Sequence, residues 1–449
     1  MLKPVKMGLC MGVLCAMLAL CGAAGAQETA FYEEMPPFLR VVQNTQTETV
    51  RDNVYIRRTY PRTANPEIDA QLCGLVDEMV EKNREKLPGA SASVPSYLEV
   101  GPVITRTGTS WMSFLTLAEV SGGQEQLSVD FDARVMDMET GERITLEDVF
   151  PPDSEAWALL AQAVREQLSA AFPGEAPDEQ ALSALCAEKL RSAPFTLGAE
   201  RLTLTYRADA VYPGRQTLLH VHLYYPQIRP LMTERARQQT DNSRFRMVAL
   251  TYDDGGGRIY TRNLLDALRM YAAKATFFVV GTQIGRNHDT LCRQQDGGYS
   301  IQSHTYTHAY PGSFTVQQAF EDKERFSVEL SAVIGVTPTM MRSPGGMDQF
   351  YVENEIGYPL IHWSLASGDS GNNDGVERIT NRVLWGVGDG DIVLMHDINP
   401  NCANYTKRIL EALSGQGYLF VTVEELFARE GVVPQANHVY MRPDWEQTE

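Results

Sequence analysis

Two adjacent aspartates in the second half of the chain stand where an α/β enzyme could use them. Asp253 and Asp254 follow an apolar, strand-like run at residues 247–250 and precede three glycines. Carboxylates at the carboxyl end of a barrel strand are typical of catalytic sites, and glycines let a substrate or metal approach the backbone closely. Taken alone, however, this segment fits a solvated Asp-Gly turn somewhat better than a site.

A pair of histidines supplies the second candidate element. His304 and His308 lie four residues apart, a spacing that predicts two imidazoles on one side of a helical turn. The pair alone could equally arise by chance. With Asp254 as a third ligand, the set becomes two histidines and one carboxylate, which leaves open positions for water, as catalytic zinc and related metals require.

Two further motifs follow along the chain. Residues 342–346 read Arg-Ser-Pro-Gly-Gly, and residues 394–396 read Leu-Met-His, which places His396 at the end of another buried strand. A single histidine at a strand end is usually structural. The order and spacing of all these motifs nevertheless resemble the polysaccharide deacetylases of the NodB-homology group, carbohydrate esterase family 4. The resemblance covers residues 245–431 and includes the strand and glycine context of residues 274–281.

This resemblance implies a fold, a reaction and a cofactor. The fold class is α/β, a distorted (β/α) barrel preceded by a smaller α+β module, and the reaction is metal-dependent removal of acetyl groups from N-acetylated sugars. Asp254, His304 and His308 would hold one divalent metal, which lowers the pKa of bound water toward ~7. Zinc is the first expectation, and cobalt, nickel and manganese stay open because aspartate and histidine suit several metals.

The resemblance also assigns the proton-transfer roles. Asp253 would be the general base that deprotonates the attacking water, and His396 the general acid that protonates the departing sugar amine. Arg342 resembles the arginine that pairs with the base, and Asp369 resembles the carboxylate that tunes the acid histidine. The backbone N–H of Gly345 would stabilise the tetrahedral oxyanion.

Several positions depart from the commonest family pattern and leave the sugar open. Gly256 replaces the usual proline after the aspartates, and Gly345 replaces an aromatic residue, so we expect a wider pocket there. Ala366 and Ser370 replace an aspartate and a tryptophan, which removes a stacking surface for a sugar ring. Leu394, in the motif of His396, is expected to face the substrate.

The elements around these motifs predict a parallel sheet or barrel, since apolar strand-like runs alternate with helical stretches. Strands are expected at residues 247–251, 275–280, 392–395 and 418–421, and helices at residues 261–271, 316–334 and 404–413. A polar stretch at residues 233–244 is expected to be the linker before this domain, and residues 432–449 a tail.

Residues 40–232 are expected to form the α+β accessory module. Core-facing helices are predicted at residues 68–80 and 157–172, and strands at residues 112–120, 127–136, 202–206 and 218–224, the first two joined as a hairpin through a Gly-Gly turn. Residues 140–150 and 224–226 weakly resemble an extracellular module found before deacetylase domains and in lysozyme-sensing anti-sigma factors. This order of modules resembles muramic-acid peptidoglycan deacetylases. His220 and His222 could bind metal, but a plain strand face is favoured.

The N-terminus predicts export. Lys3 and Lys6 precede an apolar run at residues 7–26 that ends in Ala-Gly-Ala, the pattern of a signal peptide over residues 1–26. The alternative is an uncut anchor, which would be the only membrane contact. Four cysteines follow the leader, and disulfides between them are permitted outside the cell: Cys73, Cys186, Cys292 and Cys402.

Composition narrows the partners further. The chain of 449 residues is 43% hydrophobic and carries a net charge of −18, so it can bury real cores but is a poor partner for nucleic acid. The leading hypothesis is an extracellular or wall-associated deacetylase of N-acetylated glycan, most plausibly peptidoglycan. The alternatives are an O-acetyl xylan or glycan esterase, and a wall-binding or lysozyme-sensing protein with an inactive barrel. The oligomeric state stays open.

Overall fold

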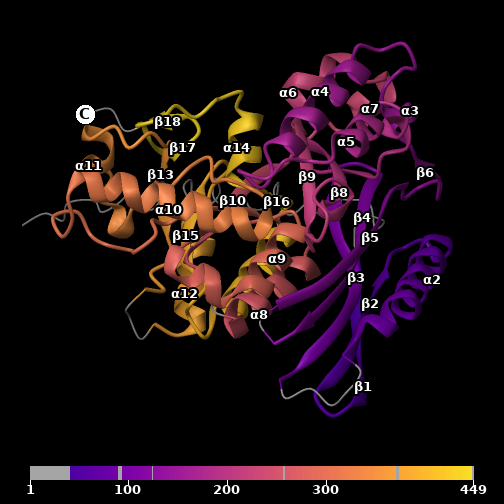
Figure 1. Cartoon of the computed structure of the whole chain (residues 1–449), viewed down its shortest axis with the longest axis horizontal. Coiled ribbons are helices and arrows are strands. Elements are labelled where there is room, and N and C mark those ends of the chain that lie inside the picture. The colour runs from indigo at the N-terminus through magenta and orange to yellow at the C-terminus, as the bar shows by residue number, and fades with distance from the viewer. Residues whose placement is uncertain (1–40, 89–93, 124, 256–257, 371–373, 447–449) are drawn as a thin grey trace, which may run out of the picture.

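The computed structural model describes residues 41–446, except residues 89–93, 124, 256–257 and 371–373. Two parts lie side by side, a sheet-rich part coloured indigo to magenta and an α/β part coloured orange to yellow (Figure 1). None of the described helices is both long enough and apolar enough to cross a bilayer. The predicted leader lies outside the described residues, and the four cysteines that follow it are all free thiols.

The first part contains two sheets, and the predicted hairpin is confirmed. Neighbouring strands pair antiparallel, except that β2 and β3 pair parallel. The larger sheet has the order β1(Val42–Arg51), β2(Val54–Arg62), β3(Ser96–Arg106), β4(Trp111–Gly122), β5(Glu125–Asp137) and β6(Arg143–Ile144). The smaller sheet has the order β7(Phe195–Leu197), β8(Arg201–Arg207) and β9(Leu218–Tyr224).

The helices of the first part cover these sheets with the apolar faces expected from their spacing. The longest, α2(Pro66–Asn83), begins at the N-cap Asn65, whose side chain accepts hydrogen bonds from two backbone N–H groups of the first turn. Its buried face carries the predicted Ile68 and Leu72. The other helices are α3(Leu146–Val149), α4(Ala156–Ser169), α5(Glu179–Cys186), α6(Tyr225–Ile228) and α7(Glu234–Gln239).

The expected linker at residues 233–244 is instead folded. Thr233 caps α7 by accepting a hydrogen bond from the N–H of Ala236, which is buried in the core of the first part. Arg235 forms an ion pair with Asp137 at 2.9 Å. The polar composition predicts a linker, but Ala236 of this short helix is buried, and Arg235 pairs with the sheet.

The second part is a distorted barrel of parallel strands. The central strand β10(Arg246–Asp254) pairs with β11(Thr276–Val279) on one side and β15(Ile392–His396) on the other, and β16(Tyr418–Phe420) pairs with its beginning. Strand β12(Ser300–Ser303) follows β11, and Met341 bridges it to β13(Leu360–Ile361). Because β14(Leu365–Ala366) continues from β13 and pairs with β15, the ring of parallel strands closes.

Helices lie around this ring (Figure 1). They are α8(Arg258–Met270), α9(His288–Asp296), α10(Val316–Ile334), α11(Asp348–Glu353), α12(Val376–Gly386), α13(Cys402–Gly415) and α14(Val423–Arg429). The residues expected as a tail form β17(Val439–Arg442) and β18(Trp445–Glu446) instead, with β17 pairing parallel to β13. Val439 and Tyr440 are buried, so this end of the chain extends the sheet.

Buried charges join the two parts. Glu99 on β3 accepts hydrogen bonds from Arg57, Arg262 and Arg293, and Glu119 on β4 pairs with Arg269 at 2.9 Å. Burial raises the pKa of Glu99, but the surrounding guanidinium groups outweigh it and hold that pKa well below the usual range. The first part is therefore fixed to helices α8 and α9 of the barrel by an ion network.

Replacing Glu99 with glutamine is expected to lower the free energy of unfolding by about 2 kcal/mol, because it removes the charge of a buried carboxylate that three guanidinium groups share, although each of them keeps another acidic partner. The exposed Glu81 provides the matched control, and its replacement with glutamine should change stability by less than about 0.5 kcal/mol. Denaturant unfolding at neutral pH measures both. Since the pKa of Glu99 is lowered in the fold, its contribution is present above the unfolded value of about 4.3 and is lost as pH falls below it.

Candidate active site

A pocket of about 690 Å³ opens at the carboxyl ends of the barrel strands. Of the nine residues predicted for the site, eight line it, namely Asp253, Asp254, His304, His308, Gly345, Asp369, Leu394 and His396. The ninth, Arg342, lies fully buried behind the wall and reaches the pocket through Asp253. Segments spread over more than 140 residues are thus brought to one place by the ends of adjacent strands.

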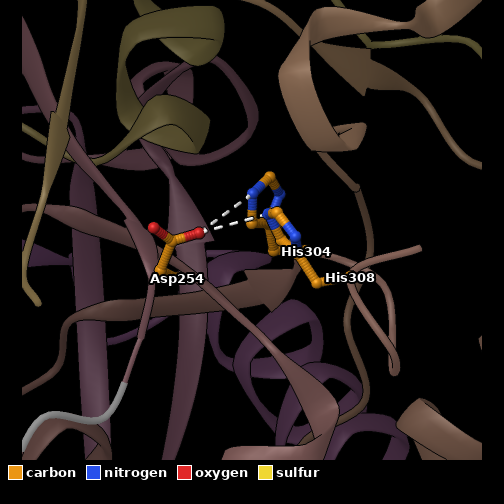
Figure 2. A group of neighbouring side chains, drawn as sticks. All are labelled: Asp254, His304 and His308. Atoms are coloured by element: carbon orange, nitrogen blue, oxygen red, sulfur yellow. Dashed lines mark ion pairs between the residues drawn. The ribbon is translucent and has the colours of Figure 1, made fainter. Parts of the chain in front are cut away.

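Three of these residues converge as metal donors. The Nε2 atom of His308 lies 3.3 Å from Oδ1 of Asp254, and the Nε2 atom of His304 lies 3.6 Å from the same oxygen (Figure 2). All three donor atoms lie within 4.8 Å of one another, and no other group of three His, Cys, Asp or Glu donors occurs in the described part of the chain.

The loop that presents the histidines is not the expected helical turn. Thr305 and His308 adopt left-handed backbone conformations, with φ of 61° and 56°, and Asp254 does so at 77°. The hydroxyl of Thr305 accepts a hydrogen bond from the N–H of His308 at 3.0 Å, and Asp322 accepts from the backbone of the intervening residues. Such backbone conformations cost free energy and persist where the surroundings impose them, often at functional sites.

The donor set fits a divalent cation. His304 Nδ1 lies 2.8 Å from the carbonyl oxygen of Arg342, so that nitrogen donates and Nε2 keeps its lone pair toward Asp254. Two ligand atoms that each lie ~2.0–2.1 Å from a tetrahedral zinc ion are about 3.3 Å apart. The separations of Asp254 Oδ1 from the two histidine Nε2 atoms, 3.3 and 3.6 Å, are close to this value. Burial lowers the pKa of His304 and so favours the neutral imidazole that a ligand must be. Burial raises the pKa of Asp254, but the hydrogen bond with His308 and the nearby histidines outweigh it and lower that pKa.

One carboxylate oxygen of Asp253 is hydrogen-bonded to Arg342, and the other faces the pocket. Its Oδ1 accepts from Nη1 of Arg342 at 2.7 Å, and its Oδ2 lies 3.8 Å from Nε2 of His304. Arg342 is itself fixed by hydrogen bonds to the hydroxyl of Thr251 and to the carbonyl oxygens of Ile361 and His362, each at 2.8 Å. A carboxylate fixed in this way can accept a proton from a water molecule in the pocket.

His396 stands beside Asp253 because the two residues are register partners on β15 and β10. Its Nδ1 lies 2.8 Å from Oδ1 of Asp369, and the other oxygen of Asp369 accepts from the hydroxyl of Tyr405 at 2.5 Å. Burial lowers the pKa of His396, but the Asp369 carboxylate outweighs it, so the net pKa is raised. The ring is therefore able to carry a proton at Nε2 near neutral pH.

The wider pocket expected at Gly345 is not observed. Gly345 has a φ of 63°, and a Cβ there would lie 2.8 Å from the ring of Tyr310. Tyr310 packs edge-on against His308 with ring centroids 5.6 Å apart, and half of its surface stays exposed. An aromatic ring from the histidine loop therefore occupies the space that Gly345 leaves. Tyr310 and Trp363 also line the pocket, which partly offsets the stacking surface missing at Ser370.

Asp348 supports the site although no sequence motif indicated it. Its carboxylate accepts from the hydroxyl of Ser343 at 2.5 Å and lies 2.6 Å from Nδ1 of His362. These contacts join the residue before the Pro-Gly-Gly turn and the ring of His362 to one buried carboxylate that follows the turn. A Cβ on Gly346 would lie 2.6 Å from the His362 ring, so the turn also packs closely against His362. Asp348 thereby holds in place the turn that carries Gly345.

The other histidine pair makes no comparable site. His220 and His222 stack on β9 with ring centroids 6.0 Å apart, and their Nδ1 atoms contact the hydroxyls of Thr205 and Thr203. No third donor joins them within the described residues.

Comparison with known proteins places this site in a family. The family model described as polysaccharide deacetylase matches residues 240–358. A peptidoglycan-N-acetylglucosamine deacetylase of Bacillus cereus is 35% identical over 193 residues, which cover 40% of this chain and 88% of the relative. The chain belongs to the polysaccharide deacetylase family.

Other members of the family match only in part. A peptidoglycan-N-acetylglucosamine deacetylase of Listeria monocytogenes is 36% identical over 184 residues, which cover 41% of this chain and 39% of the relative. A peptidoglycan-N-acetylmuramic acid deacetylase of Bacillus subtilis is 28% identical over 190 residues, 42% of this chain and 40% of the relative. The matched region thus spans about two fifths of the length of these longer deacetylases.

Proposed function

We propose that this polysaccharide deacetylase is an exported, metal-dependent enzyme that hydrolyses N-acetyl groups of cell-wall glycan, with peptidoglycan as substrate. One observation carries the proposal: the donor triad, the arginine-fixed Asp253 and the aspartate-fixed His396 all meet in one pocket. A binding protein has no need for a base and an acid on either side of three metal donors.

The residues divide the reaction between them. Asp254, His304 and His308 would hold the cation, zinc first with cobalt, nickel or manganese as alternatives, and the bound cation supplies a Lewis acid. Asp253 accepts a proton from the water that attacks the acetamide carbon. His396 donates a proton to the sugar nitrogen as the C–N bond breaks, so the products are acetate and a free amine.

Gly345 and Leu394 complete the proposed substrate contacts. The N–H of Gly345 is assigned to the oxyanion of the tetrahedral intermediate. Leu394 is 8% exposed at the pocket wall and offers an apolar surface to the acetyl methyl group. Two of the relatives above are named for N-acetylglucosamine and one for N-acetylmuramic acid, which supports an N-acetylated wall sugar as the substrate. The export part of the proposal rests on the leader pattern of residues 1–26.

The assignment of His396 as the general acid predicts how the pH dependence of kcat/KM changes in a variant. The raised pKa of His396 depends on the Asp369 carboxylate, so Asp369→Asn should lower the pKa of the histidine. The histidine would then lose its proton at lower pH, and the alkaline limb of the kcat/KM profile should move to lower pH by about one unit or more. Steady-state rates between pH 6 and 10 measure this shift, and an unchanged alkaline limb would exclude His396 as the acid.

The direct test is acetate release by the chain from Gln27 onward, with metal added or chelated. Peptidoglycan and N-acetylglucosamine oligomers are the substrates, and an O-acetylated xylan is the comparison. Chelator-sensitive acetate from either N-acetylated substrate is expected. Acetate from the xylan alone would make the protein an O-acetyl esterase, and no acetate from any substrate would contradict the proposal.

A further inference from the structure

A second cleft of about 580 Å³ lies where the first part meets the opposite end of the barrel. Its barrel residues include Asp389, which precedes β15, and its other wall includes Glu200, Arg229 and Asp241 from the first part. The catalytic residues stand at the far end of β10, a strand of nine residues that is about 26 Å long at ~3.3 Å per residue. The cleft is therefore separate from the catalytic pocket.

Glu200 is the unusual residue of this cleft. It is only 7% exposed, yet among the described residues no hydrogen bond or ion pair reaches its carboxylate. Its position is fixed, because its carbonyl oxygen accepts from the N–H of Tyr225 at 3.0 Å in the short connection between β7 and β8. Burial raises its pKa to about 7. A buried carboxylate of this kind normally has a partner.

The other acids around the cleft are already matched. Asp389 and Glu430 pair with Arg429 at 2.6 and 2.7 Å, and Asp241 accepts from the N–H of Ser243 at 3.0 Å. The neighbouring Glu425 lies 3.5 Å from Nε of Arg201. Glu200 is thus the one acid among these that lacks a partner.

Arg229, the positive charge nearest in effect to Glu200, forms no direct ion pair with the described residues of the cleft. Arg229 donates to the carbonyl oxygen of Thr240 at 2.7 Å and lies over the ring of Tyr225 at 5.5 Å, but no carboxylate in the described residues lies within ion-pair distance of it. A carboxylate and a guanidinium that attract each other without a direct ion pair therefore line the same cleft. Ligand pockets of small molecules typically have volumes of this size, with a few convergent polar groups.

We propose that this cleft binds an α-amino-acid zwitterion, whose ammonium group pairs with Glu200 and whose carboxylate pairs with Arg229. A carboxylate is the natural partner of a guanidinium, and an ammonium group supplies the donors that Glu200 lacks. A divalent cation fits poorly, since the cleft has no three-donor group among the described residues. Free α-amino acids carry both groups on one carbon atom.

Isothermal titration of the protein from Gln27 onward tests the site, with D-alanine, L-alanine and the dipeptide D-alanyl-D-alanine as probes. Methylammonium and acetate, which carry one group each, are the comparison. Saturable binding of D-alanine or L-alanine is expected, at least about tenfold tighter than that of either single-group probe. Tighter binding of alanine than of the dipeptide would support the proposal, whereas tighter binding of the dipeptide, whose ammonium and carboxylate lie on different residues, would overturn the assignment to an α-amino acid.

Variants decide the assignment. Glu200→Gln and Arg229→Gln should each weaken binding about tenfold or more, whereas Asp241→Asn, which changes a matched cleft acid, should stay within about threefold. Acetate release should be unchanged in all three. Binding that survives in both glutamine variants, methylammonium binding as tight as that of alanine, or no binding at about 10 mM would each overturn the proposal. The readout is binding, so it stays informative even if the proposed deacetylase activity fails.

Discussion

Replacing Asp253 with asparagine is expected to lower acetate release by about 10²- to 10⁴-fold while metal binding persists, because the change removes the proton acceptor and spares all three metal donors. The asparagine oxygen can still accept the 2.7 Å hydrogen bond from Arg342, so the wall of the pocket should keep its shape. The loss should fall on kcat, since the carboxylate acts on the attacking water and not on binding of the sugar. Steady-state kinetics and metal analysis of the same preparation measure both quantities.

Asp209 offers a control of the same chemistry in the first part of the chain. It forms an ion pair with Arg207 at 2.5 Å, so Asp209→Asn makes the same substitution beside an arginine but far from the pocket. That variant should retain full turnover. Undiminished acetate release by the Asp253 variant would remove Asp253 as the base, and a variant without metal would show that Asp253 itself belongs to the ligand set.

A helix or strand was predictable where its apolar residues recur with the period of that element over the element's usual length. The predicted helix at residues 316–334 matches α10 in full, and the hairpin of β4 and β5 follows from alternation around a glycine turn. The predictions of a linker at residues 233–244 and a tail at residues 432–449 were wrong for the same reason. Each segment is short and polar in composition, and what fixes it is contact with distant residues: Arg235 with Asp137, and β17 with β13. Such contacts leave no local pattern.

The candidate site was likewise predictable only in part. Residue types and order were sufficient to select the donors, because few patterns combine paired aspartates with two histidines. The conformation that joins them was not predictable, since the left-handed Thr305 and His308 depend on hydrogen bonds from Asp322 and the Thr305 hydroxyl. Tyr405 and Tyr310 were missed because an aromatic residue in a helix or loop is most often core or surface. Only the fold reveals what each ring contacts.

Replacing His304 with alanine is expected to remove both metal and activity. The histidine provides one of three protein donors and is the donor whose tautomer is fixed, through the 2.8 Å contact of its Nδ1 with the Arg342 carbonyl oxygen. Loss of a Lewis acid worth several kcal/mol corresponds to about a thousandfold or greater fall in rate. Metal content by elemental analysis and acetate release, measured on one preparation, should fall together.

The chain contains its own control for this change. His220 has both ring nitrogens hydrogen-bonded, to the Thr205 hydroxyl at 3.1 Å and the Gln295 carbonyl oxygen at 2.9 Å, and it lies outside the donor triad. His220→Ala should keep its metal and its turnover even if it loses stability, so unfolding and metal loss can be told apart. A fully metallated His304 variant would mean that the ligand set is wrong. A variant without metal that keeps its rate would mean that Asp253 and His396 suffice for the reaction, because only then is the cation dispensable.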